Sequence, residues 1–162
     1  IFINGGDTRL YQRLYARGKA RDIIVKRFAA GANIGGSSAG ALILSRQCIV
    51  WGNKILRKGK SFNLSCPTAN TDSRNAATML KTGTGIGVLD STVVDVHGSE
   101  WGRLPRLIEA MKQLNAGDGL MIDEDTYVII RPNSARWTIE GNGRIYRIKA
   151  VKTGYVVSTN PA

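Results

Sequence analysis

The segment Gly36-x-Ser38-x-Gly40 constrains the fold of this chain more than any other part of it. It follows a short apolar stretch, residues 32–35, and precedes a second one, residues 41–46. Glycines two places before and two places after a serine permit a sharp strand-to-helix turn that exposes the hydroxyl, because the backbone passes very close to itself there. The pattern therefore predicts a buried parallel strand, a tight turn and an apolar helix, which is an α/β arrangement.

The rest of the chain alternates between helix and strand patterns in its first half and is dominated by strands at its end. Apolar periodicity predicts helices over residues 8–17, 23–30 and 104–114, with Gly18 as the stop of the first. Strand patterns fall at residues 1–4, 93–97, 120–122 and 126–130, and residues 137–148 read as a hairpin turning at 141–143. Residues 52–83 show little pattern and are expected to form a long loop with a short helix near residues 76–80. We expect one α/β domain over residues 1–162, with a mostly parallel sheet and antiparallel C-terminal strands.

The beginning of the chain is unusual. Residue 1 is Ile1 rather than methionine, and residues 1–4 already read as a strand. We expect the chain to be a fragment or a processed form, with N-terminal elements of its fold lying outside it.

Composition excludes several classes of protein. The formal net charge is +11, but the basic residues are scattered and no nucleic-acid motif accompanies them, so nucleic-acid binding is a minor hypothesis. The apolar runs are far shorter than the roughly 20 residues of a membrane span. Two cysteines without CxxC spacing and a single histidine argue against a zinc site, and no cofactor is expected. The few cysteines favour a reducing cytoplasm.

Ser38 is the candidate nucleophile of the glycine-flanked turn. The N–H that follows it, on Ala39, would face a developing oxyanion at the start of a helix. A second glycine-rich turn, Gly5-Gly6-Asp7, follows the first strand and could supply another donor from Gly6 or Asp7. The competing interpretation is a small-residue turn that only begins a buried helix.

A serine nucleophile needs a base, and His97 is the only histidine of the chain. It stands at the end of a predicted strand, where α/β active sites form. A third residue must orient the imidazole. The pattern leaves four candidates open: Asp95, Asp123, Glu124 and Asp125.

Five segments, in this order and spacing, resemble the cyanophycinase and dipeptidase E family of serine peptidases, and the cyanophycinase branch more closely. The matching segments are Ile3-Asn4-Gly5-Gly6-Asp7, Gly36-Ser37-Ser38-Ala39-Gly40-Ala41, Val94-Asp95-Val96-His97, Gly102-Arg103-Leu104-Pro105-Arg106-Leu107 and Gly119-Leu120-Met121-Ile122-Asp123-Glu124-Asp125-Thr126. The resemblance implies a class I glutamine-amidotransferase-like three-layer sandwich whose members have further N-terminal elements. It also implies Ser38 as nucleophile, His97 as base and Glu124 as the triad acid.

By the same resemblance, Gly6, Asp7 and Ala39 would form the oxyanion hole, and Asp95, Arg103 and Arg106 would line the substrate pocket. The chain departs from the cyanophycinase pattern at four positions that surround these residues. The four substitutions are Val96 for a glutamine, Gly98 for an aromatic residue, Thr8 for a glutamine and Trp101 for the first pocket arginine. Lost polar contacts change specificity more than reaction type, so the expectation is peptide hydrolysis with an altered substrate.

We therefore expect a serine-type exopeptidase or dipeptidase that hydrolyses small or aspartyl-containing peptides, with Arg103 and Arg106 positioning a substrate carboxylate. Solvated helix-start charge is the competing interpretation of both arginines. The alternative function is a catalytically silent relative that binds a peptide or a partner protein. A homodimer is the candidate assembly.

Overall fold

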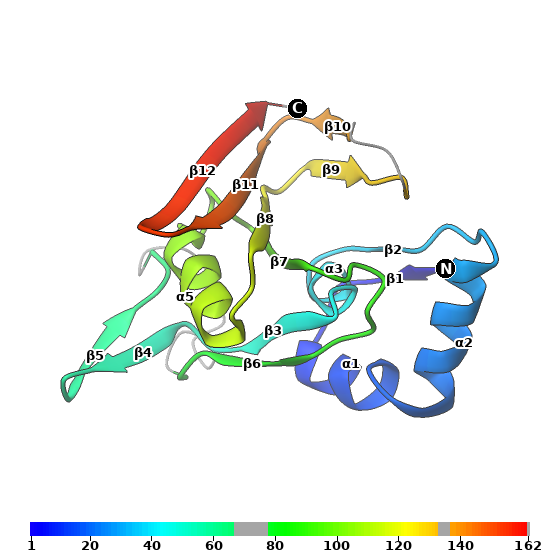
Figure 1. Cartoon of the computed structure of the whole chain (residues 1–162), viewed down its shortest axis with the longest axis horizontal. Coiled ribbons are helices and arrows are strands. Elements are labelled where there is room, and N and C mark those ends of the chain that lie inside the picture. Colours follow the sequence, from blue (N-terminus) through cyan, green and yellow to red (C-terminus); the bar gives the residue numbers. More distant parts are fainter. Residues whose placement is uncertain (67–77, 133–136, 162) are drawn as a thin grey trace.

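A computed structural model of the chain describes residues 1–66, 78–132 and 137–161 (Figure 1). The described helices are α1 (Thr8–Tyr15), α2 (Gly18–Ala29), α3 (Ala39–Ile43) and α5 (Leu104–Leu114). The strands of the first half are β1 (Phe2–Ile3), β2 (Gly35–Gly36), β3 (Gln47–Trp51), β4 (Lys54–Arg57), β5 (Lys60–Asn63) and β6 (Lys81–Thr84). Those of the second half are β7 (Thr92–Val96), β8 (Asp118–Ile122), β9 (Thr126–Ile129), β10 (Thr138–Gly141), β11 (Arg144–Val151) and β12 (Gly154–Pro161).

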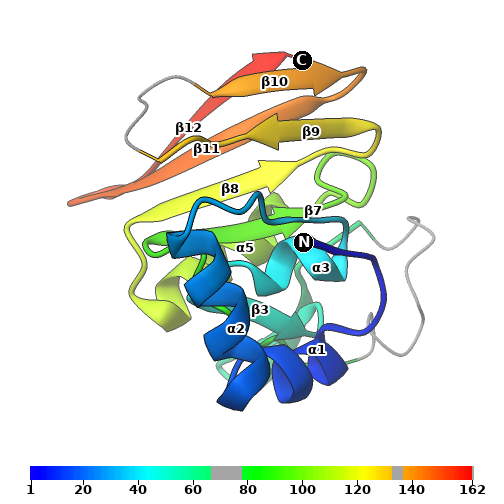
Figure 2. The same cartoon turned by 90° about the vertical axis from the view of Figure 1, so that its right-hand side faces the viewer.

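The largest sheet has the strand order β12-β11-β8-β7 and stacks above the helices in Figure 2. Strands β7 and β8 pair in parallel, whereas β8 with β11 and β11 with β12 pair antiparallel. Among the pairs of described strands only β1–β2 is also parallel, and two isolated bridges, Ser45 with Leu89 and Lys54 with Met79, are parallel as well. The chain is α/β as predicted and its C-terminal strands are antiparallel, but the prediction of a mostly parallel sheet is wrong for the described strands.

Helix α5 joins the large sheet to the rest of the molecule. Its bounds agree with the predicted helix at residues 104–114, because Pro105 is tolerated in the first turn and Asn115 ends the helix in a left-handed conformation. Leu107, Ala110 and Met111 recur at helical spacing and are fully buried. They pack on β7 and β8 and form one hydrophobic cluster with Ile49 of β3 and Ile148 of β11 and their neighbours.

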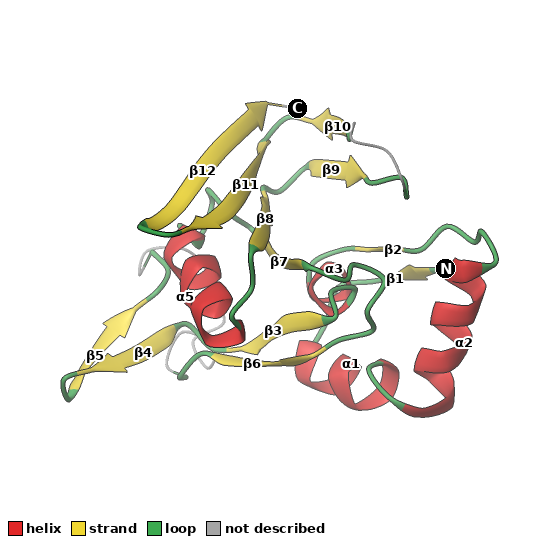
Figure 3. Ribbon diagram, viewed as in Figure 1, coloured by secondary structure: helices red, strands yellow, loops and turns green. Residues whose placement is uncertain are grey.

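Helices α1 and α2 lie at the opposite end of the molecule from the β4–β5 hairpin (Figures 1 and 3). They contribute to a second cluster in which Ile24 and Ala16 pack with Ile43 of α3. A third cluster joins Leu42 of α3 to Val94 of β7. Helix α3 therefore lies between two apolar layers, which fixes the turn that precedes it.

Three sequence predictions of local structure are wrong. Gly18 begins α2 rather than ending a helix, since its φ of 63° suits a glycine at the junction between α1 and α2. Residues 52–83 are not one long loop: β4 and β5 form a hairpin that turns at Lys58-Gly59, both at positive φ, as a two-residue hairpin turn requires. Of the helix expected near residues 76–80, residues 76 and 77 lie outside the described residues, and residues 78–80 are not helical.

The hairpin predicted for residues 137–148 is also wrong. Strand β10 pairs with β9, while β11 pairs with β8 and β12. Gly141, the last residue of β10, has a φ of 127°, and a Cβ on it would lie 2.0 Å from the Asp125 carbonyl oxygen. None of the described helices has the length and apolar content that a membrane span needs.

Candidate active site

Ser38 stands at the turn between β2 and α3 in the strained conformation that the glycine pattern predicts. Its φ of 49° and ψ of −118° are rare for a residue with a side chain. A Cβ on Gly36 would lie 2.4 Å from the carbonyl carbon of Gly40, and a Cβ on Gly40 would lie 1.9 Å from the carbonyl oxygen of Ile3. Both glycines are therefore required by the close backbone approach, which also turns the serine hydroxyl outward.

His97 and Glu124 continue from Ser38 in one chain of hydrogen bonds. The Ser38 hydroxyl oxygen lies 3.0 Å from Nε2 of His97, and Nδ1 of His97 lies 2.8 Å from Oε1 of Glu124. His97 follows the end of β7 and Glu124 follows β8, which are parallel neighbours, so both side chains come from the same edge of the sheet. This geometry is that of a nucleophile, a base and an orienting acid.

The other acidic candidates are occupied elsewhere. Asp123 accepts hydrogen bonds from the N–H of Ser99 at 2.8 Å, from the Ser99 hydroxyl at 2.9 Å and from the N–H of Arg144 at 3.1 Å. Asp125 accepts a hydrogen bond from the side-chain amide of Asn142. Of the four acids that the sequence left open, Glu124 is the one that contacts the imidazole.

The environment of His97 favours its neutral form. Burial lowers the pKa of His97 and the nearby Arg103 guanidinium lowers it further, while the hydrogen bond and charge of Glu124 and the charge of Asp95 oppose the shift. A base must be unprotonated to accept the proton of a serine. The lowered pKa therefore favours the unprotonated form of His97 at neutral pH, the form in which an imidazole can accept a proton.

The residues predicted for the oxyanion hole line a cavity of about 260 Å³ beside Ser38. Gly6, Asp7 and Ala39 all face it, together with His97. The side chain of Asp7 caps α1 by accepting the N–H of Arg9 at 2.8 Å, and its carboxylate is paired with the Arg9 guanidinium. Within the described residues the Ala39 N–H has no hydrogen-bond acceptor, so it remains able to donate to a bound group.

The three residues predicted to bind substrate are almost wholly buried. Asp95 is 0% exposed and Arg106 is 2% exposed, and they form a two-point ion pair in which Nε of Arg106 donates to Asp95 at 2.8 Å. Nη1 of Arg106 also donates to Asn53 at 3.2 Å. Both arginines line the smaller cavity, whereas Asp95 does not. Contact of Asp95 with substrate stays a prediction, and its observed partner is Arg106.

Arg103, 3% exposed, donates from Nη1 to the carbonyl oxygen of Val96 at 3.1 Å and packs with its guanidinium carbon 4.0 Å from the centre of the Trp101 ring. Its Nε has no partner among the described groups. Burial and the neighbouring Arg106 lower its pKa, but a guanidinium stays cationic at neutral pH. Arg103 therefore brings a buried positive charge close to His97.

Trp101 is a site residue that sequence reasoning noticed only as a departure from the family pattern. Its ring stacks on the imidazole of His97, with 4.5 Å between ring centres and 15° between planes. Its position four residues after the only histidine, in a turn, was the available signal. That signal is weak, because the conformation of the turn was not predictable.

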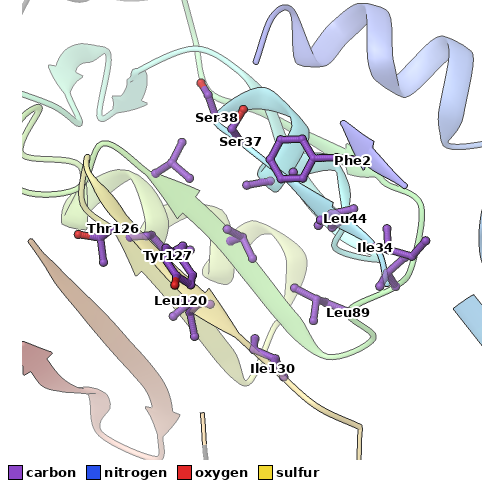
Figure 4. Close-up of a pocket in the computed structure, with 18 of the residues that line it drawn as sticks. Phe2, Ile34, Ser37, Ser38, Leu44, Leu89, Leu120, Thr126, Tyr127 and Ile130 are labelled. Atoms are coloured by element: carbon purple, nitrogen blue, oxygen red, sulfur yellow. The ribbon is translucent and has the colours of Figure 1, made fainter. Parts of the chain in front are cut away.

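A second cavity, of about 670 Å³, also borders Ser38 (Figure 4). Ser37, His97 and Glu124 are among its other lining residues. The remainder of its lining is mostly apolar and includes Phe2, Ile34, Leu44, Leu89, Leu120 and Ile130. The cavity gives an apolar group space close to the serine hydroxyl.

Metal binding and the buried thiol of Cys48 also bear on the chemistry that the described residues can perform. No group of three or more His, Cys, Asp or Glu side chains there could hold a metal ion. Burial raises the pKa of Cys48 to about 12, and a thiol that stays protonated is a poor nucleophile.

Comparisons with known proteins place this geometry in context. No known family profile matches the chain. The chain is 27% identical over 132 residues to a cyanophycinase of Geminocystis herdmanii, which covers 81% of this chain and 42% of that protein. It is also 27% identical over 130 residues to cyanophycinases of Trichormus variabilis and a Nostoc species, covering 80% of this chain and 38% of each protein.

The chain thus spans about two fifths of the length of the curated relatives it matches. Among solved structures, a peptidase from an acI-B1 actinobacterium has a similar fold, with a TM-score of 0.60 and 20% identity, covering 100% of this chain and 56% of that one. Together the sequence matches and the shared fold confirm the predicted resemblance of this chain to the cyanophycinase and dipeptidase E family.

Proposed function

We propose that this chain is a serine-type peptidase that uses Ser38, His97 and Glu124 as a catalytic triad. The observation that carries the proposal is the continuous hydrogen-bonded chain from the Ser38 hydroxyl through His97 to Glu124, on a turn strained at φ 49°. A strained serine turn is costly and persists where the exposed hydroxyl has a use.

The reaction begins when the Ser38 hydroxyl oxygen attacks the carbonyl carbon of a peptide bond while Nε2 of His97 takes the hydroxyl proton. The Glu124 carboxylate accepts a hydrogen bond from the Nδ1–H group of His97 and stabilises the imidazolium that forms. Donors from Ala39 and from Gly6 or Asp7 stabilise the oxyanion. His97 then gives its proton to the leaving amine, which departs and leaves an acyl group on Ser38. Water hydrolyses the acyl group by the same steps, and the serine is regenerated.

The proposed substrates are small peptides, including aspartyl-containing ones, cleaved by an exopeptidase or dipeptidase. The relatives named cyanophycinase support this class. The departures from the cyanophycinase pattern at Val96 and Trp101, where the resemblance implies polar residues, support a different specificity. Arg103 and Arg106 line the smaller cavity and supply positive charge for a substrate carboxylate. We further propose one domain with a glutamine-amidotransferase-like sandwich, a homodimeric assembly and a cytoplasmic location.

Labelling with a fluorophosphonate probe tests the nucleophile. We expect wild-type protein to be labelled at one site and Ser38→Ala not to be labelled. Ser37→Ala is the matched control, because Ser37 lines the large cavity beside Ser38 but makes no hydrogen bond to His97 within the described part of the chain, and it should still be labelled. Folded wild-type protein without any label refutes the triad and favours the alternative, a catalytically silent relative that binds peptides.

Cleavage of Asp-Xaa dipeptides and of β-Asp-Arg, followed by mass spectrometry of the products, tests the substrate class. We expect release of amino acids from at least one Asp-Xaa dipeptide and none with Ser38→Ala. Cleavage confined to peptides without aspartate would contradict the aspartyl preference and leave the serine mechanism in place.

A further inference from the structure

The indole ring of Trp101 covers the imidazole of His97. The two ring centres are 4.5 Å apart and the planes differ by only 15°, so the rings lie nearly parallel. His97 itself has a φ of 56°, in the left-handed region, which is uncommon for a residue with a side chain. A residue in this conformation persists only where its surroundings hold it.

The imidazole turns about its Cβ–Cγ bond, and a turn about that bond would move both ring nitrogens away from their partners. Ser38 and Glu124 contact the two ring nitrogens and oppose this turn only through their two hydrogen bonds. A ring stacked on the face of the imidazole opposes the same turn by direct contact and excludes water from that face.

Trp101 is itself held in place from several directions. The backbone N–H of Trp101 donates to the carbonyl oxygen of His97 at 3.2 Å, and the backbone carbonyl oxygen of Trp101 accepts the N–H of Cys66 at 2.9 Å. The Arg103 guanidinium packs 4.0 Å from the centre of the indole, while its Nη1 is tied to the carbonyl of Val96. An aromatic ring fixed in this way can fix the ring it contacts.

We propose that Trp101 is the positioning residue of His97: it sets the plane of the imidazole between Ser38 and Glu124 and shields one face from water. The proposal deepens the proposed function and rests on it. The indole does not touch the reacting atoms, so its role is to keep the base aligned with the nucleophile.

The charges around His97 decide how its titration responds to the loss of the indole. Glu124 at the edge of the sheet and Asp95 on β7 favour the imidazolium, while Arg103 at the start of α5 disfavours it. Asp7 lines the smaller cavity together with His97. Burial is the largest cause of the lowered pKa of His97, so replacing the indole by a smaller group lets water in and raises that pKa.

Two variants distinguish the effect of aromatic stacking on His97 from the effect of the size of the side chain at position 101. Trp101→Phe keeps an aromatic face, and Trp101→Leu keeps an apolar side chain that cannot stack. Trp137→Phe is the matched control, because Trp137 also packs against an arginine, with the Arg147 guanidinium carbon 4.1 Å from its ring centre, whereas among the described rings it is Trp101 that stacks on His97.

His97 is the only histidine in the chain, so its ring signals in an NMR titration are unambiguous. We expect the Trp101→Leu variant to lose the ring-current shift of the imidazole protons and to titrate at a higher pH than wild type. Trp101→Phe should lie between them, and Trp137→Phe should match wild type. Fluorophosphonate labelling of Trp101→Leu should slow by roughly 10- to 100-fold, since small misplacements of a catalytic group have effects of this size.

Trp101→Leu protein that titrates and labels as wild type does would overturn the proposal. A Trp101→Phe variant that behaves as Trp101→Leu does would also overturn it, since aromatic stacking would then be irrelevant. Because the titration needs no activity, it separates the two hypotheses: wild-type protein that takes no label refutes the proposed function, and unchanged imidazole shifts in Trp101→Leu refute the positioning role on their own.

Discussion

The buried ion pair of Asp95 and Arg106 gives the sharpest test of how this site is held together. Asp95 is fully buried, and both of its carboxylate oxygens contact the Arg106 guanidinium. The Asp95→Asn variant keeps the shape of the side chain but removes its charge. It leaves the cation of Arg106, and that of Arg103 4.0 Å from the same carboxylate, without their buried anion.

Removing one partner of a buried pair costs about 3–5 kcal/mol, because the remaining charge stays desolvated. The free energy of unfolding of a typical domain is roughly 5–15 kcal/mol, so the loss would be a large share of the stability of the protein. For a chain of this size about 1 kcal/mol corresponds to a shift of roughly 2–4 °C in Tm, which makes the expected fall about 6–20 °C.

Urea denaturation followed by far-ultraviolet circular dichroism measures the effect, with an unchanged m-value showing that two-state unfolding is retained. Asp90→Asn is the matched control, since the Arg46–Asp90 pair has side chains that are 58% and 74% exposed. Exposed pairs contribute about 0–1 kcal/mol. An Asp95→Asn variant no less stable than Asp90→Asn would refute the structural role of Asp95, and a raised KM with unchanged stability would instead support direct contact with substrate.

Four further predictions concern the turn, the triad and, in two cases, the effect of pH. Gly40→Ala should lower the free energy of unfolding by about 1–3 kcal/mol or more, because the new Cβ would meet the Ile3 carbonyl oxygen at 1.9 Å, while Gly117→Ala, with open space, should be neutral in the same urea titration. Glu124→Gln should slow fluorophosphonate labelling on the order of 10²-fold, less than for a buried triad acid because Glu124 is 49% exposed, and an unchanged rate would exclude Glu124 from the triad. The acid limb of kcat/KM against pH should have its midpoint below 6.5, the ordinary histidine pKa, and a midpoint above it would contradict the buried base. Since the pKa of His97 is lowered in the folded state, the unfolded chain binds the proton first as the pH falls. The contribution of His97 to the free energy of unfolding is therefore full above pH 6.5 and is lost as the pH drops toward the folded-state pKa. This part of the pH dependence should vanish in the His97→Gln variant.

Much of the serine turn could be predicted from local sequence. Glycine at positions 36 and 40 and the apolar segments on either side specify a turn whose sterics act over five residues, and the structure shows those close approaches. Helix α5 was predicted with its observed bounds for the same reason, since its apolar periodicity and Pro105 are local signals.

Strand pairing could not be predicted from local sequence. The segment after Trp137 has a good hairpin turn, yet β10 pairs with β9 and β11 pairs with β8. Which edge a strand joins depends on burying its apolar face against the whole sheet, and that is decided by partners distant in the sequence. The same limit hid β6, whose partner β3 lies more than thirty residues earlier.

The sequence by itself determined that a serine stands on a strained turn and that His97 is the only histidine able to serve it, because both facts are local or a matter of count. Only the tertiary structure decided which of three consecutive acids reaches the imidazole. Asp123 turns inward to Ser99 and Arg144, and Asp125 turns to Asn142, while Glu124 meets His97. The stacking of Trp101 on the His97 ring and the ion pair between Asp95 and Arg106 were likewise decided by the tertiary structure alone. Such contacts depend on where packed elements bring side chains together, which spacing along the chain does not specify.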